Sequence, residues 1–111
     1  MKVSILILDY LKADRVIKNV KSLLKQQINF DLEICVVDNS ANLRNSQKLI
    51  KAFKDLPEVL LKIADKNLGY TRGNNWGAKA LTGKYLLIVN PDIIWKDSHT
   101  LQTMVDFMEN N

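Results

Sequence analysis

Residues 67–92, NLGYTRGNNWGAKALTGKYLLIVNPD, contain one complete unit of the fold. A loop rich in Asn and Gly leads into a helical segment at roughly 74–81, which Thr82-Gly83 ends. The apolar run 85–89 has the length of a buried strand, and it stops at Asn90-Pro91-Asp92. Because Asn, Pro and Asp favour turns, the stretch predicts a helix, a buried strand and a carboxylate held at the end of that strand.

The same alternation runs through the rest of the chain. Short apolar runs predict further buried strands at 3–8, 32–37 and 59–64. Apolar residues at three- and four-residue spacing predict amphipathic helices at 16–24, with Asp14 as the N-cap, around 49–53, and at 101–108, with Ser98 as the cap. Strands that alternate with helices indicate an α/β fold, with a mostly parallel sheet and helices on both faces.

Length and composition indicate a single soluble domain over residues 1–111. The chain has 47% hydrophobic and 25% charged residues, an ordinary globular balance, and no apolar run of the ~20 residues that span a membrane. It also lacks a secretory signal pattern, so we expect a cytoplasmic protein. The net charge of +4 comes from scattered lysines without interleaved aromatic residues, which argues against nucleic-acid binding. Cys35, inside an apolar run, is interpreted as a core residue.

Polar residues follow all four predicted strands: Asp9, Asp38 and Asp65 come immediately after the first three, and Asn90-Pro91-Asp92 follows the fourth. Ligands of parallel α/β sheets bind outside the carboxyl ends of the strands, although solvated turns alone could produce the same pattern. The segment after the first strand, LDYLKADR, has no glycine, and the chain has no P-loop. Carboxylate and amide oxygens at strand ends suit Mg²⁺ or Mn²⁺, which would bridge a substrate diphosphate.

Four blocks of sequence carry a resemblance to a known family. They are VSILILDY at 3–10, VVDNS at 36–40, NLGYTRGNNWG at 67–77 and LTGKYLLIVNPD at 81–92. In order and spacing they resemble the inverting family-2 glycosyltransferases of the GT-A fold, and the Asn-Pro-Asp form most resembles the rhamnosyltransferase-like branch. The resemblance implies a Rossmann-like nucleotide-binding half that holds a nucleotide-diphosphate sugar such as dTDP-rhamnose, with Mg²⁺ or Mn²⁺.

The family pattern assigns roles to individual residues. Tyr10 is expected to flank the nucleobase, and Leu8 to offer backbone groups. Asp38 and Asn39 stand where the family reads the base. Asn90-Pro91-Asp92 corresponds to the usual D-x-D metal motif, with Asp92 as the metal ligand and Asn90 near the ribose or the metal.

The loop before the third helix is also expected to contribute to the nucleotide site. The resemblance places Asn67, Gly69, Asn74 and Asn75 there. Arg72 has two readings of equal weight, a diphosphate ligand or a solvent-exposed loop residue. Trp76 and Trp95 flank the predicted site, and packing is the commoner role for Trp than stacking on a base or sugar. His99, the only histidine, is interpreted as a surface or capping residue.

The resemblance also marks what the chain lacks. The family's catalytic base is a carboxylate well beyond the metal motif, and none of Asp97, Asp106 and Glu109 is assigned that role. We therefore expect the truncated N-terminal part of a longer enzyme, not competent alone, which would act on a saccharide or lipid-linked acceptor in polysaccharide biosynthesis at the inner face of the membrane. The alternative is a non-catalytic GT-A-like domain used for nucleotide binding or protein assembly. An incompletely covered sheet would also favour a homodimer.

Overall fold

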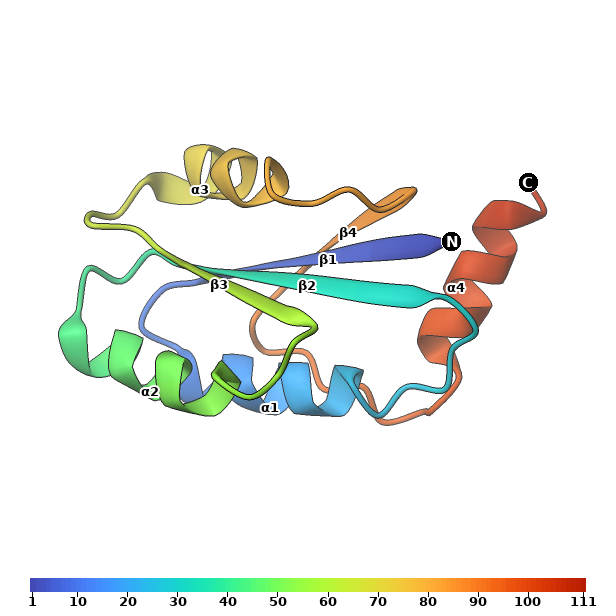
Figure 1. Cartoon of the computed structure of the whole chain (residues 1–111), viewed down its shortest axis with the longest axis horizontal. Helices are drawn as coiled ribbons and strands as arrows, with labels where there is room; N and C mark the ends of the chain where they lie inside the picture. The colour runs from blue at the N-terminus through green and yellow to red at the C-terminus, as the bar shows by residue number, and fades with distance from the viewer.

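The computed structural model describes all 111 residues, and strands alternate with helices along the whole chain (Figure 1). The strands are β1 (Lys2–Asp9), β2 (Asp31–Asp38), β3 (Val59–Ile63) and β4 (Tyr85–Val89). The helices are α1 (Ala13–Leu23), α2 (Leu43–Phe53), α3 (Gly69–Ala78) and α4 (Thr100–Glu109). The predicted α/β fold is confirmed.

The sheet is wholly parallel, with the strand order β3-β2-β1-β4. Helices α1 and α2 lie on one face and α3 on the other, while α4 lies beyond the end of the sheet where β1 begins (Figure 1). The chain proceeds from β1 outward to β3 and then returns to place β4 on the opposite side of β1. The carboxyl ends of β1 and β4 therefore form the point where strand order reverses, which is where open α/β sheets bind ligands.

Two apolar clusters hold the layers together. The larger one joins the α1 and α2 faces to the sheet and includes Val16, Val20, Leu23 and Leu49, all fully buried. The smaller one lies beneath α3 and contains Leu6, Cys35 and Val37. Cys35 is a core residue as predicted, and burial raises the pKa of its thiol to about 11.

The predicted caps of two helices are wrong. Helix α1 begins after Lys12, so Asp14 lies inside its first turn. The Asp9 carboxylate accepts from the Lys12 backbone N–H at 2.9 Å, and the Asn45 side-chain oxygen accepts from that of Ala13 at 3.2 Å. One local partner, Asp9, and one tertiary partner, Asn45, thus satisfy N–H groups at the start of the helix.

Helix α4 likewise begins after His99, and Ser98 lies one residue before that cap position. The Asp97 carboxylate accepts from the His99 N–H at 2.8 Å, and the Gln26 side chain accepts from the Leu101 N–H at 2.9 Å. His99 is exposed at this helix start, in agreement with its interpretation as a surface residue.

Helix α3 begins at Gly69, five residues before the expected start at 74, so most of the Asn/Gly stretch is helical. Side-chain oxygens of Asn39 and Asn67 accept from the N–H groups of Leu68 and Gly69, at 3.1 and 2.9 Å. A Cβ added at Gly77 would lie 2.5 Å from Leu6 Cδ1. These contacts outweigh the poor intrinsic helix propensity of Asn and Gly.

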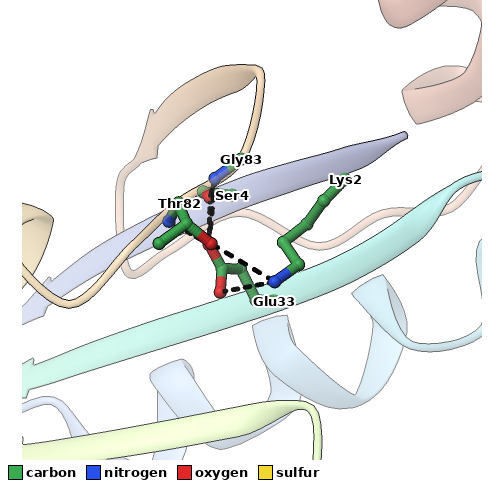
Figure 2. A network of polar contacts seen from close by, with 5 residues as sticks. All are labelled: Lys2, Ser4, Glu33, Thr82 and Gly83. Atoms are coloured by element: carbon green, nitrogen blue, oxygen red, sulfur yellow. Dashed lines mark hydrogen bonds and ion pairs between the residues drawn. The ribbon is translucent and has the colours of Figure 1, made fainter.

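A polar network fixes the connection between α3 and β4 at the amino end of the sheet (Figure 2). The Glu33 carboxylate accepts from the Ser4 hydroxyl at 2.6 Å and from the backbone N–H groups of Thr82 and Gly83, the latter at 3.1 Å, and Lys2 lies 3.7 Å away. Burial raises the pKa of Glu33, but these hydrogen bonds outweigh it and leave the pKa below its usual value. The network lies at the amino ends of the strands, opposite the predicted site, so its role is structural.

Candidate functional site

A cavity of about 270 Å³ opens at the carboxyl ends of β1 and β4, where the strand order reverses. We call it the β1–β4 cavity. Its lining residues are Leu8, Tyr10, Lys12, Tyr70, Asn74, Ile88, Val89, Asn90 and Pro91. Four residues assigned to the nucleotide from the sequence, Leu8, Tyr10, Asn74 and Asn90, therefore meet in one place.

Asn74 is the unusual polar residue of this cavity. Its side chain is 7% exposed, and neither its amide oxygen nor its amide nitrogen has a hydrogen-bond partner. A buried polar group without a partner costs about 1–3 kcal/mol, and such groups in native proteins call for a functional or structural reason. Asn74 is thus a ready hydrogen-bonding group for a ligand that enters the β1–β4 cavity.

The Asp92 carboxylate beyond β4 is exposed and faces two cations from the start of α1. It lies 3.0 Å from the Arg15 guanidinium and 3.4 Å from the Lys12 ammonium. The hydrogen bond from Arg15 is the main cause that holds the pKa of Asp92 below its usual value. Lys12 also lines the β1–β4 cavity, so positive and negative charges meet at its mouth.

A buried amide on α1 holds the Asn90-Pro91-Asp92 turn in place. The Asn19 side chain is fully buried and donates to the carbonyl oxygens of Asn90, at 2.9 Å, and Pro91, at 3.3 Å. Its oxygen accepts from the Trp95 indole N–H at 3.1 Å. Trp95 is half-buried against the larger apolar cluster and so has a packing role.

Sequence reasoning missed Asn19, although a signal was present. It shares the apolar face of its helix with Val16, Val20 and Leu23, and a polar side chain at such a position needs a partner. The cations Lys12 and Arg15 and the aromatic residue Tyr70 were also missed, and exposed residues of these types carry no pattern of their own.

The carboxylates after β1 and β2 are buried and linked through Asn45. Its amide donates to Asp9 at 2.6 Å and to Asp38 at 3.4 Å. Asp38 also accepts from the Ser40 N–H at 3.0 Å and from the Ser46 hydroxyl. Burial raises the pKa of Asp9 despite the hydrogen bonds from Asn45 and Lys12. In this arrangement Asp38 is occupied in holding its own loop and α2.

Asn39 is likewise engaged within the protein. It is 2% exposed, and its amide accepts from the Leu68 N–H and donates to the Gly69 carbonyl, both at 3.1 Å. Asn39 thus fastens the start of α3, where Asn67 and Gly69 lie exposed, to the end of β2. It positions the helix that carries Asn74.

Arg72 and Asn75 lie apart from the other predicted site residues. They line a second cavity, of about 650 Å³, between the end of β3 and α3, with Asp65, Trp76 and Lys79 among its other residues. Arg72 donates to the Leu68 carbonyl at 3.2 Å. Trp76 of α3 packs against the smaller apolar cluster, and the centre of its ring lies 4.2 Å from the Lys62 ammonium. We call the cavity lined by Arg72 and Asn75 the β3–α3 cavity.

The residues around Asp92 fit a metal only when a substrate shares in binding it. No cluster of three His, Cys, Asp or Glu side chains able to hold a metal occurs in the chain. Mg²⁺ commonly binds through one or two carboxylates together with substrate phosphates. Asp92, with the Asn90 side chain two residues away, matches that donor set.

Comparisons with known proteins identify the family. The sequence model described as "Glycosyl transferase family 2" matches residues 4–111. An uncharacterized glycosyltransferase of Nostoc sp. is 28% identical over 109 residues, which cover 98% of this chain and 33% of that protein. The chain thus spans about a third of the length of this relative.

Solved structures show the same fold. The crystal structure of residues 1–349 of TarS from S. aureus matches with a TM-score of 0.81 and 21% identity, over 99% of this chain and 33% of that 1–349 chain. A mannosyltransferase from Pyrobaculum calidifontis, in complex with GDP-Man and Mn²⁺, matches with a TM-score of 0.86 and 20% identity, over 96% of this chain and 32% of that one. TarS has also been solved with UDP-GlcNAc. No helix of the present chain combines the length and apolar character needed to cross a membrane. From the match over residues 4–111, the chain belongs to glycosyl transferase family 2.

Proposed function

We propose that this chain binds the nucleotide part of a nucleotide-diphosphate sugar, within a glycosyltransferase that passes the sugar to an acceptor. The observation that carries the proposal is the β1–β4 cavity at the strand-order reversal, where Tyr10, Asn74 and Asn90 converge. The structures of two proteins of the same fold, solved with UDP-GlcNAc and with GDP-Man, support a nucleotide-sugar ligand.

The predicted site residues fall into three groups by their place in the structure. Leu8, Tyr10, Asn74 and Asn90 line the β1–β4 cavity and would contact the nucleoside. Asp38, Asn39, Asn67 and Gly69 would act indirectly, because their hydrogen bonds fasten the loops that form the site. Arg72 and Asn75 would come into play only for a ligand that extends into the β3–α3 cavity.

Asp92 would hold Mg²⁺ or Mn²⁺ together with the diphosphate. Such a metal neutralises charge on the departing diphosphate as a Lewis acid. Lys12 and Arg15, which pair with Asp92, would turn toward the phosphates when the metal binds, since guanidinium and ammonium groups both bind phosphate oxygens.

The donor sugar and acceptor are proposed from the sequence motifs alone. The Asn-Pro-Asp form favours rhamnose carried by dTDP, and the family resemblance favours a saccharide or lipid-linked acceptor, in polysaccharide biosynthesis at the inner face of a membrane. No carboxylate of this chain is assigned as the base that activates the acceptor.

The competing proposal is a domain used for assembly, and the free edge of β4 favours it. Strand β4 pairs only with β1, and an apolar groove of about 460 Å³ runs between it and α4. Leu86, Met104, Phe107 and Met108 are between 41% and 66% exposed there. An open, apolar edge strand is a site of association, and we propose that it mediates a homodimer.

Sedimentation tests the dimer. We expect the chain to associate at submillimolar concentration. Phe107→Glu should abolish this association, and Leu43→Glu should leave it intact. Leu43 is a suitable control because it is 74% exposed on α2, away from this groove. A monomer at millimolar concentration contradicts the dimer without bearing on nucleotide binding.

Calorimetric titration with dTDP and UDP, with and without Mn²⁺, tests the proposed function. We expect binding that strengthens with Mn²⁺ and is lost in Asp92→Ala. Asp14→Ala is the matched control, because Asp14 is also an exposed carboxylate paired with a cation, Lys48, at 3.2 Å. Absence of binding of either nucleotide at millimolar concentration contradicts the proposal.

A further inference from the structure

We infer that Asn74 reads the edge of a pyrimidine base in the β1–β4 cavity, with Tyr70 and Tyr10 as aromatic contacts for its ring. The inference rests on the proposed function and adds the class of base that the site would bind. It also assigns recognition of the base to a residue of α3, in place of the residues that follow β2.

The other polar side chains at the ends of β1 and β2 already have partners within the protein. The side chains of Asp38 and Asn39, which follow β2, are buried and bonded to Ser40, Ser46, Leu68 and Gly69. The Asp9 carboxylate is bonded to Lys12 and Asn45. Each of these groups already has protein partners, so a base would have to displace them.

Asn74 has no such partners. Both of its amide atoms are buried and unpaired, and the residue lines the β1–β4 cavity. A carboxamide presents one donor and one acceptor side by side. This pair is complementary to the imide edge of uracil or thymine, where an N–H lies next to a carbonyl.

The remaining lining suits a flat and largely apolar ring. Leu8, Ile88 and Val89 supply aliphatic contacts, and Tyr10 and Tyr70, which are 51% and 65% exposed, stand at the opening. Bases stack on aromatic side chains irrespective of sequence. The volume of about 270 Å³ lies just below the range of about 300–1,000 Å³ for small-molecule sites, which favours a pyrimidine over the larger purine.

Calorimetry with UDP and GDP on the whole chain tests the inference, with Asn74→Asp as the main variant. A carboxylate accepts two hydrogen bonds and donates none. It therefore repels the uracil carbonyl, but it matches the adjacent N–H and NH₂ donors of guanine. We expect wild type to prefer UDP and Asn74→Asp to shift the UDP/GDP affinity ratio toward GDP by about tenfold or more.

Asn29→Asp is the matched control, because it introduces the same charge at an exposed position just before β2, at the end of the sheet opposite the β1–β4 cavity. It should leave the ratio unchanged. Tyr70→Ala should weaken UDP binding by about tenfold, and Tyr70→Phe should retain it. A thermal melt identifies any variant that has lost its fold. If Asn74→Asp does not fold because Asn74 is buried, the UDP affinities of Tyr70→Phe and Tyr70→Ala still test the site, because Tyr70 is exposed.

The outcomes separate the inference from the proposed function. An unchanged UDP/GDP ratio in folded Asn74→Asp overturns the role of Asn74 while nucleotide binding stands. Tighter binding of GDP than UDP by wild type overturns the pyrimidine assignment. Failure of wild type to bind any nucleotide overturns both.

Discussion

The guanidinium of Arg15 lies 3.0 Å from the carboxylate of Asp92, across 77 residues of sequence. Asp92, which the sequence predicts to be a metal ligand, is thus paired with the cation Arg15 from α1. A metal at Asp92 has to compete with this pair, while a diphosphate would draw Arg15 away from it. In the proposed function, the pair would therefore link metal binding to substrate binding.

Replacement of Arg15 by Gln should raise the pKa of Asp92 toward its ordinary value of 3.8, because the hydrogen bond from Arg15 is the main cause of its lowering. The side-chain carboxyl carbon of Asp92, followed by NMR from pH 2 to 6, reports the change. Lys12→Gln should produce a smaller shift. An Asp92 pKa that is unchanged in Arg15→Gln contradicts the importance of this contact.

Asn19→Ala should lower the free energy of unfolding by about 1–3 kcal/mol, because it leaves buried polar partners of the Asn90-Pro91-Asp92 turn and the Trp95 indole unpaired. Chemical denaturation measures the loss. Lys18→Ala, one residue earlier and exposed on the same helix, controls for the effect of truncation. Equal stability of the two variants is the result that conflicts with the proposed clamp.

Glu33→Gln should lower the free energy of unfolding by about 1 kcal/mol at pH 7, since hydrogen bonds to a charged acceptor are stronger than those to a neutral one. The folded-state pKa of Glu33 is below its usual 4.5. Its contribution is therefore complete above about pH 4.5 and disappears as the pH falls through the folded-state pKa.

Urea denaturation at pH 7 and at pH 2.5 tests this dependence. Wild type and Glu33→Gln should differ at pH 7, and the difference should shrink at pH 2.5. Glu58→Gln, at an exposed position, should match wild type at both. A difference that persists undiminished in acid would show that the charge of Glu33 is not its cause.

Gly77→Ala should destabilise the fold by about 1–3 kcal/mol through overpacking, because the added Cβ would lie 2.5 Å from Leu6 Cδ1 and 2.6 Å from Val37 Cγ2. Gly69→Ala meets no atom within 4 Å, but the φ of Gly69 is +78°, so its cost of about 1 kcal/mol is conformational. Denaturation of both variants distinguishes packing from backbone strain. A smaller loss in Gly77→Ala than in Gly69→Ala would contradict the close packing of α3 on β1.

Most of the fold could be predicted because its strands are short apolar runs with clear ends. The interval predicted for β4 agrees with the structure at both ends, residues 85–89. The start of α3 could not be predicted, since its capping oxygen atoms include one from Asn39, thirty residues earlier. The start of α1 similarly depends on Asn45 from α2. Tertiary hydrogen bonds of this kind leave no mark in the local sequence.

The position of the candidate site could be predicted from the sequence, but not which residues face it. Parallel topology alone brings Tyr10 and Asn90 to one edge of the sheet, and they line the same cavity. The sequence could not separate residues that face this cavity from those buried behind it. Asp38 and Asn74 both belong to polar motifs of the sequence, but the Asp38 side chain is hydrogen-bonded within the protein and the Asn74 side chain has no partner.

An NMR titration of the isotopically labelled chain with UDP and Mg²⁺ tests the central claim most directly. The account predicts saturable shifts that are largest at the backbone amides of Tyr10, Asn74, Asn90 and Asp92, which surround the β1–β4 cavity and its mouth. Replacement of Mg²⁺ by Mn²⁺ should broaden the Asp92 signal first. Shifts confined to Arg72, Asn75 and Trp76 of the β3–α3 cavity, or no saturable shift at millimolar UDP, would contradict it.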